Sequence, residues 1–185
     1  MKKNTLITIG VILVLILAFF AISYNSLIKL DEGANQAYSQ IDNVIQRRAD
    51  LIPNLVNTVK GYTKHESETL QKVLEARSNV KDAKNLTELA EANTELTKSI
   101  NVMVEAYPEL KANTVYTQLM DELAGAENRI SVERKNYNKT VQNFNTKLKR
   151  FPTNIIANIL GFSERTYFEA DPSAKTVPQV DLISE

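Results

Sequence analysis

The spacing of apolar residues separates a uniformly apolar N-terminal stretch from a series of amphipathic stretches. Residues 6–22 are apolar except for one threonine, and no charged residue lies between Lys3 and Lys29. A helix of this composition is long enough to cross the ~30 Å hydrocarbon layer of a membrane. We therefore predict an N-terminal anchor over residues 1–24, with the membrane span at about residues 5–24.

A cleavable signal peptide is the main alternative for this segment. Lys2 and Lys3 form a basic start, and Ala21-Ile22-Ser23 is an acceptable cleavage site. We favour the anchor because the apolar run is longer than the hydrophobic region of a signal peptide, and no polar region follows it. The positive-inside rule puts the N-terminus in the cytoplasm and the remainder outside. The charge difference is small, so the opposite orientation stays open.

After the anchor, apolar residues continue at alternating spacings of three and four: Leu27, Leu30, Ala34, Ala37, Ile41 and Val44. This seam is typical of a helix that packs along another helix. We predict one helix from about residue 5 to residue 49. Pro53 disfavours helical geometry in the residue before it, so a turn is expected at residues 49–53. Asp50 would cap a second helix there.

Three amphipathic helices follow from the remaining pattern. The second helix continues to about Val80, the third begins after Asn85 and ends before Pro108, and the fourth begins after Asn113 and ends before Pro152. No strand-like alternation occurs. Short connections make successive helices antiparallel. The predicted fold class is all-α: an N-terminal transmembrane helix continuing into an antiparallel up-down four-helix bundle with long helices and a short C-terminal capping helix.

The short capping helix is expected at residues 154–162, which are apolar on one face and too few to be stable alone. We interpret this segment as a lid over one end of the bundle. The less favoured interpretation is an interfacial membrane contact assisted by three basic residues, Lys147, Lys149 and Arg150. The helical bundle would cover residues 25–168. Residues 169–185 are sparse in apolar side chains, and we expect a mostly disordered tail.

Composition excludes several classes of function. Basic and acidic residues each number 22, so the chain lacks the positive excess that binds nucleic acid. Without cysteine, disulfides and thiolate metal sites are excluded. The single histidine, His65, lacks the Glu-x-x-His spacing of a bundle metal site, and no nucleophile elbow or phosphate-binding glycine loop occurs. We therefore predict no enzyme: no catalytic residue, cofactor or metal.

One polar cluster is denser than a helical bundle requires, and we mark it as a candidate interaction surface: Arg47, Arg48, Asp50, Lys60, His65 and Glu66. Arginines near a turn can bond helix-end carbonyls and carboxylates, which is a structural role. They can also dock an acidic partner or a lipid headgroup. We favour the structural role, because surface ion pairs are common.

Several segments together resemble the signature of the LemA family: RRADLIPNLV (47–56), VKGYTKHE (59–66), YPELKAN (107–113), ENRI (127–130), FPTNIIA (151–157) and YFEA (167–170). The resemblance implies a bacterial membrane protein with one N-terminal span and a helical bundle. It supplies no activity. A relative takes part in forming magnetosome membranes, which by analogy points to organisation of the cell envelope.

These observations favour a membrane-anchored, non-enzymatic scaffold or adaptor of the bacterial cell envelope, single-pass in the cell membrane. The expected partners are the lipid bilayer and either envelope proteins or further copies of the chain. The alternative is a sensor bundle that binds a lipid or small ligand under residues 153–162. Phe151, Ile155, Ile156 and Phe162 would then line the entrance. A hydrolase using His65 and a carboxylate is the least favoured hypothesis.

Overall fold

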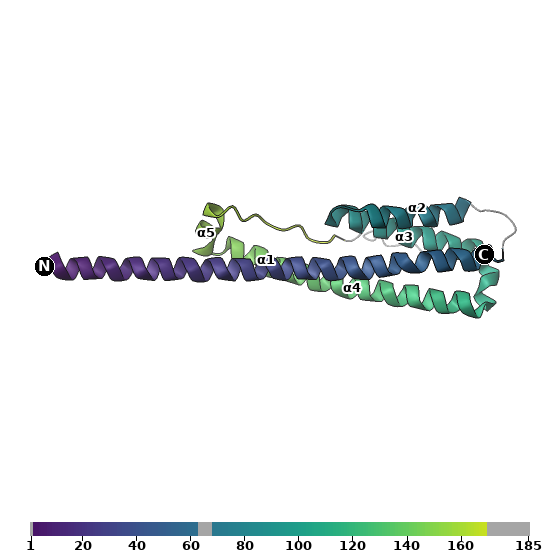
Figure 1. The fold of residues 1–185 in the computed structure, drawn as a ribbon, viewed down its shortest axis with the longest axis horizontal. Helices are drawn as coiled ribbons and strands as arrows, with labels where there is room; N and C mark the ends of the chain where they lie inside the picture. The colour runs from purple at the N-terminus through teal and green to yellow at the C-terminus, as the bar shows by residue number, and fades with distance from the viewer. Residues whose placement is uncertain (1, 63–67, 170–185) are drawn as a thin grey trace, which may run out of the picture. The chain divides into compact units, whose positions relative to one another are not determined.

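The computed structural model describes residues 2–62 and 68–169, and all regular structure in them is helical. Figure 1 shows the elements in chain order: α1 (Lys2–Lys60), α2 (Glu68–Asp82), α3 (Leu86–Ala106), the 3-10 helix η1 (Pro108–Ala112), α4 (Thr114–Lys149) and α5 (Thr153–Ile159). The predicted all-α class is confirmed. The chain divides into two compact units. The first contains residues 1–40 and 133–167, and the second contains residues 41–132 and the chain from residue 168.

Helix α1 is longer than the sequence predicted. It runs to Lys60 with Pro53 inside it, so the turn expected at residues 49–53 is wrong. Proline lacks the N–H that would bond the carbonyl four residues earlier, here that of Ala49. The side chain of Arg77 on α2 supplies the missing donor, since its Nε lies 3.0 Å from the Ala49 carbonyl oxygen. The helix therefore continues through the proline without a buried unpaired carbonyl.

The second unit packs the later part of α1, α2, α3 and the first half of α4 around an apolar core. Where one helix contributes several fully buried side chains, they are three, four or seven residues apart: Ile41, Ile45, Ile52 and Leu55 on α1, Leu70 on α2, Leu89, Leu96 and Met103 on α3, and Ile130 on α4. This spacing places them on one face of each helix. The amphipathic pattern of the sequence thus identifies the positions that form this core.

The starts of α3 and α4 lie where the sequence predicts them. Asn85 Oδ1 accepts a hydrogen bond from the Glu88 N–H (2.9 Å), and a Glu88 carboxylate oxygen accepts one from the Lys84 N–H (2.8 Å). This arrangement resembles a capping box, with the Glu88 carboxylate bonding the N–H one residue before the cap. At α4, Asn113 Oδ1 accepts from the Tyr116 N–H at 2.9 Å. Each cap pairs N–H groups that the first helical turn leaves free.

The first unit has its own apolar cluster, formed by side chains of α1, α4, α5 and the chain after α5: Leu27, Phe144, Leu148 and Ala157, with Leu30 and Phe162 packed against them. The rings of Phe144 and Phe162 meet edge to face with centroids 6.4 Å apart. Helix α5 ends at Ile159, and Gly161 two residues later has a φ of 76°, which suits glycine. The short helix expected at residues 154–162 is therefore present and rests on a core.

Candidate functional site

The residues predicted to form an interaction surface divide between the exterior and the interior. Exposed side chains belong to three of them: Arg47, Asp50 and Lys60. Arg48 is only 4% exposed. His65 and Glu66 lie outside the described residues. Arg47 and Arg48 are neighbours in sequence, but successive helical residues point about 100° apart, so one faces outward and the other inward.

Arg48 is held inside the second unit by polar side chains of two helices. Its Nη1 donates to Asn93 Oδ1 (3.1 Å) and Thr97 Oγ1 (2.8 Å) on α3, and lies 2.6 Å from Glu127 Oε2 on α4. Burial lowers the pKa of Arg48 below its ordinary value, and the charge of Glu127 opposes this shift. The contacts fit the structural role that the sequence favoured for this arginine.

Asp50 also has a structural contact. Its Oδ1 lies 2.9 Å from Lys81 Nζ, and this ion pair connects α1 to α2. The hydrogen bond from Arg77 to the Ala49 carbonyl connects the same two helices at the neighbouring residue of α1. Because both charged side chains are largely exposed, this ion pair contributes little to stability. Arg47 and Lys60 are also exposed on α1.

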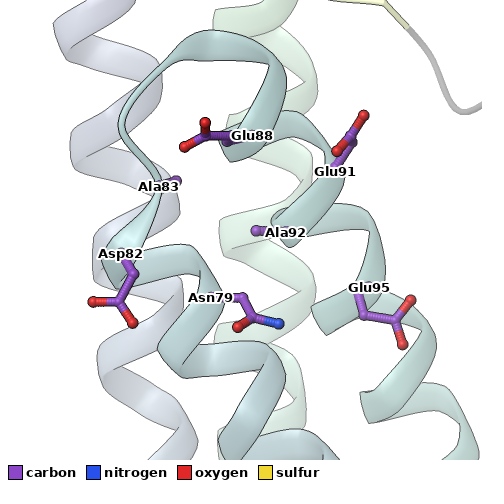
Figure 2. A pocket seen from close by; sticks show the side chains of 7 residues that line it. All are labelled: Asn79, Asp82, Ala83, Glu88, Glu91, Ala92 and Glu95. Atoms are coloured by element: carbon purple, nitrogen blue, oxygen red, sulfur yellow. The ribbon is translucent and has the colours of Figure 1, made fainter.

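A surface hollow of about 400 Å³ lies at the connection between α2 and α3, and Figure 2 shows the residues that line it: Asn79, Asp82, Ala83, Glu88, Glu91, Ala92 and Glu95. Its carboxylates do not converge, since Glu91 and Glu95 point away from Asp82 in this view. Glu88 is engaged in the cap of α3. Across residues 2–62 and 68–169, no group of three or more His, Cys, Asp or Glu side chains is placed to hold a metal ion.

The N-terminal part of α1 exposes apolar side chains all around the helix. Every large apolar side chain from Leu6 to Ile22 is between 37% and 69% exposed. By length and composition this helix is able to cross a membrane. At 1.5 Å per residue, the charge-free stretch from Leu6 to Ile28 extends about 35 Å, compared with a hydrocarbon layer of about 30 Å. These features fit a location in the membrane.

A second exposed apolar surface lies on α5 and the turn before it. Phe151 is 80% exposed, Ile155 51% and Ile159 70%, whereas Ile156 is 6% exposed. Phe162 packs against Phe144. The four side chains expected to line a ligand entrance therefore lie on different faces: two point outward and two contact the protein. They do not converge on one cavity.

Arg165 fixes the chain after α5 to α1 and α4. Its Nε donates to Asp31 Oδ1 and its Nη2 to Asn35 Oδ1, each at 2.7 Å. Its backbone N–H and carbonyl each bond the side-chain amide of Asn145 at 2.9 Å. The hydrogen bond that Arg165 donates to Asp31 raises the pKa of Arg165. No sequence pattern predicts these contacts, because Asp31 and Arg165 lie 134 positions apart.

The fold and the exposed apolar helix define an all-helical protein whose N-terminal helix has the composition of a membrane span. The model of the LemA family matches residues 37–182. The chain therefore belongs to the LemA family, as the sequence resemblance indicated.

Curated relatives agree with this assignment. Protein LemA of Metamycoplasma hominis is 29% identical over 150 residues, which cover 79% of this chain and 68% of that protein. Magnetosome protein MamQ 2 of Paramagnetospirillum magneticum is 23% identical over 203 residues, covering 94% and 75%. Magnetosome protein MamQ of Magnetospirillum gryphiswaldense is 23% identical over 189 residues, covering 85% and 70%.

Proposed function

We propose that this protein is a non-enzymatic scaffold or adaptor that its N-terminal helix anchors in the bacterial cell membrane. One observation carries the proposal. Helix α1 exposes apolar side chains throughout residues 6–22, and from Ile41 to Val59 it buries a stripe in a protein core. A helix that is apolar on every face is stable in lipid, and an amphipathic one is stable against protein. A single helix thus connects a lipid-compatible segment to a folded one.

The relatives support a role in membranes without supplying a reaction. Two of them are named as magnetosome proteins. We extend to this chain only the general idea of organising an envelope membrane through protein contacts. A scaffold needs an anchor and a surface for partners, and the described residues provide a candidate for each.

The finer features of the proposal concern packing, orientation and the partner surface. We propose that the four long helical segments pack as an antiparallel up-down bundle. The positive-inside rule favours a cytoplasmic N-terminus with the bundle outside. The docking surface for envelope proteins or a second copy consists of Arg47, Asp50 and Lys60, with His65 and Glu66. Arg48 is left out of this surface because its guanidinium bonds side chains inside the second unit.

Site-specific photo-crosslinking in cells tests the scaffold role. A photoreactive residue at Arg47 or Lys60 should give discrete adducts with envelope proteins or with the chain itself. The matched control places the same residue at Asn101, which is exposed on α3. Adducts from none of the three positions, or the same adducts from all three, would count against a specific docking surface.

The anchor and its orientation need separate measurements. The chain should stay with membranes after alkaline carbonate extraction, and Val14→Asp with Leu15→Asp should release it, since each charge costs roughly 3 kcal/mol at the centre of a membrane. Because the chain has no cysteine, Asn101→Cys introduces a unique thiol. Labelling of that thiol in intact cells by a membrane-impermeant maleimide is expected if the bundle lies outside, and protection would reverse the orientation.

A further inference from the structure

Three side chains of the first unit form an exposed apolar surface that we call the α5 face: Phe151, Ile155 and Ile159. We propose that the α5 face lies in the headgroup region of the membrane, beside the point where α1 leaves the hydrocarbon. This inference rests on the proposed anchor and adds a second, peripheral membrane contact to it.

The position of α5 along α1 is fixed by the apolar cluster of this unit. Ala157 of α5 and Leu27 of α1 belong to the same buried cluster. Leu27 lies five positions after Ile22, where the apolar run ends, which is about 8 Å along a helix. Ser23 is only 3% exposed, so protein already covers one side of α1 there. Helix α5 thus lies at the end of the segment that fits a membrane span.

The two faces of α5 differ in what they contact. Thr153, Ile156 and Ala157 are buried against the unit. Ile155 and Ile159 are four residues apart, so they share the opposite face. Phe151, in the turn before α5, is 80% exposed. An exposed aromatic side chain followed by two isoleucines matches the apolar side of an interfacial helix.

The charges around the α5 face favour a membrane surface as its occupant. Lys147, Lys149 and Arg150 immediately precede it, and Lys149 is paired with Glu164 at 2.7 Å. Lys147 and Arg150 therefore supply the positive charge that anionic headgroups attract. Each such cation near an anionic membrane gives about a fivefold gain in affinity. The exposed apolar side chains of α1 belong to the same unit as the α5 face. A lipid bilayer around α1 would therefore also contact the α5 face.

Depth-dependent fluorescence quenching of the full chain in lipid vesicles tests this placement. The chain has no tryptophan, so Phe151→Trp and Ile159→Trp each introduce a unique fluorophore at a largely exposed position. The probes are phospholipids brominated high or low on the acyl chain, in vesicles with and without anionic lipid. Leu13→Trp serves as the control within the span. Val102→Trp, exposed on α3, serves as the control outside the membrane.

Tryptophan at either position of the α5 face should be quenched at least about twice as strongly as tryptophan at position 102. Shallow bromines should quench it more than deep bromines, because an interfacial helix inserts only ~5–10 Å. In anionic vesicles, Lys147→Gln with Arg150→Gln should return this quenching to its level in neutral vesicles. Quenching no stronger than at position 102 would overturn the proposal. So would protection from both bromine and aqueous acrylamide, which would indicate a second copy. Failure of lipid to quench position 13 would instead remove the proposed anchor.

Discussion

Glu127→Gln removes the negative charge beside the buried guanidinium of Arg48 and keeps the shape of the side chain. The two charged groups are 2.6 Å apart, with Arg48 4% and Glu127 38% exposed. Loss of one partner costs 3–5 kcal/mol for a fully buried pair and about 0–1 kcal/mol for a surface pair. Arg48 keeps its neutral acceptors Asn93 and Thr97. We therefore expect the free energy of unfolding to fall by about 2 kcal/mol, between the values for a buried and a surface pair.

A double-mutant cycle separates this interaction from other effects of the substitutions. Arg48→Met preserves an apolar stem but leaves the buried Asn93 without its donor, so it should cost about 1–3 kcal/mol. Arg48→Met combined with Glu127→Gln should cost about 1–2 kcal/mol less than the sum of the single changes. Urea unfolding of the full chain in detergent micelles, followed by far-UV circular dichroism, measures each value. Additive effects, or a loss below about 0.5 kcal/mol in Glu127→Gln, would refute the reasoning.

Three further predictions concern other polar groups and use the same unfolding measurement. Arg77→Leu leaves the Ala49 carbonyl unpaired and should lower the free energy of unfolding by about 1–3 kcal/mol. Adding Pro53→Ala provides an N–H for that carbonyl and should recover most of the loss, and no recovery would contradict the role given to Arg77. Tyr116→Phe removes a buried hydroxyl that has no hydrogen-bond partner among the described residues, so the free energy of unfolding should stay unchanged or rise by up to about 1 kcal/mol. A clear loss of stability would show that this hydroxyl has a hydrogen-bond partner. Burial raises the pKa of Tyr137 above its ordinary 10.0, so above about pH 10 the unfolded chain releases this proton first. The contribution of Tyr137 to stability is therefore complete below pH 10 and declines above it, and Tyr137→Phe should flatten that decline in a pH series.

The parts of the fold that the sequence predicted well depend on local interactions. Asn85 and Asn113 each bond an N–H three residues ahead. Such caps, and apolar stripes at helical spacing, can be read directly from neighbouring positions. The end of α1 was missed because its cause is not local. The donor that replaces the N–H lost at Pro53 is Arg77, which lies 28 positions from Ala49 and on another helix.

Proximity in sequence does not show which side chains of the candidate site lie on the surface. A cluster in the sequence becomes a cluster on a surface only if its residues share a helix face. Arg47 and Arg48 do not, so only the first is exposed. The contacts of Arg165 are hard to predict for a different reason, because its partners Asp31 and Asn35 lie 134 and 130 positions away. No pattern within one helix identifies contacts of that kind.

Helix α5 combines two roles that the sequence pattern presents as alternatives. A short segment with a single apolar face lies either on a protein core or on a membrane surface. In the structure Ile156 and Ala157 pack inward while Ile155 and Ile159 point outward, so the helix is apolar on both sides. Packing on the cluster around Leu27 supplies the stability that seven residues lack alone. The same packing holds the outward side chains next to the end of the apolar run of α1, where a lipid headgroup region would be.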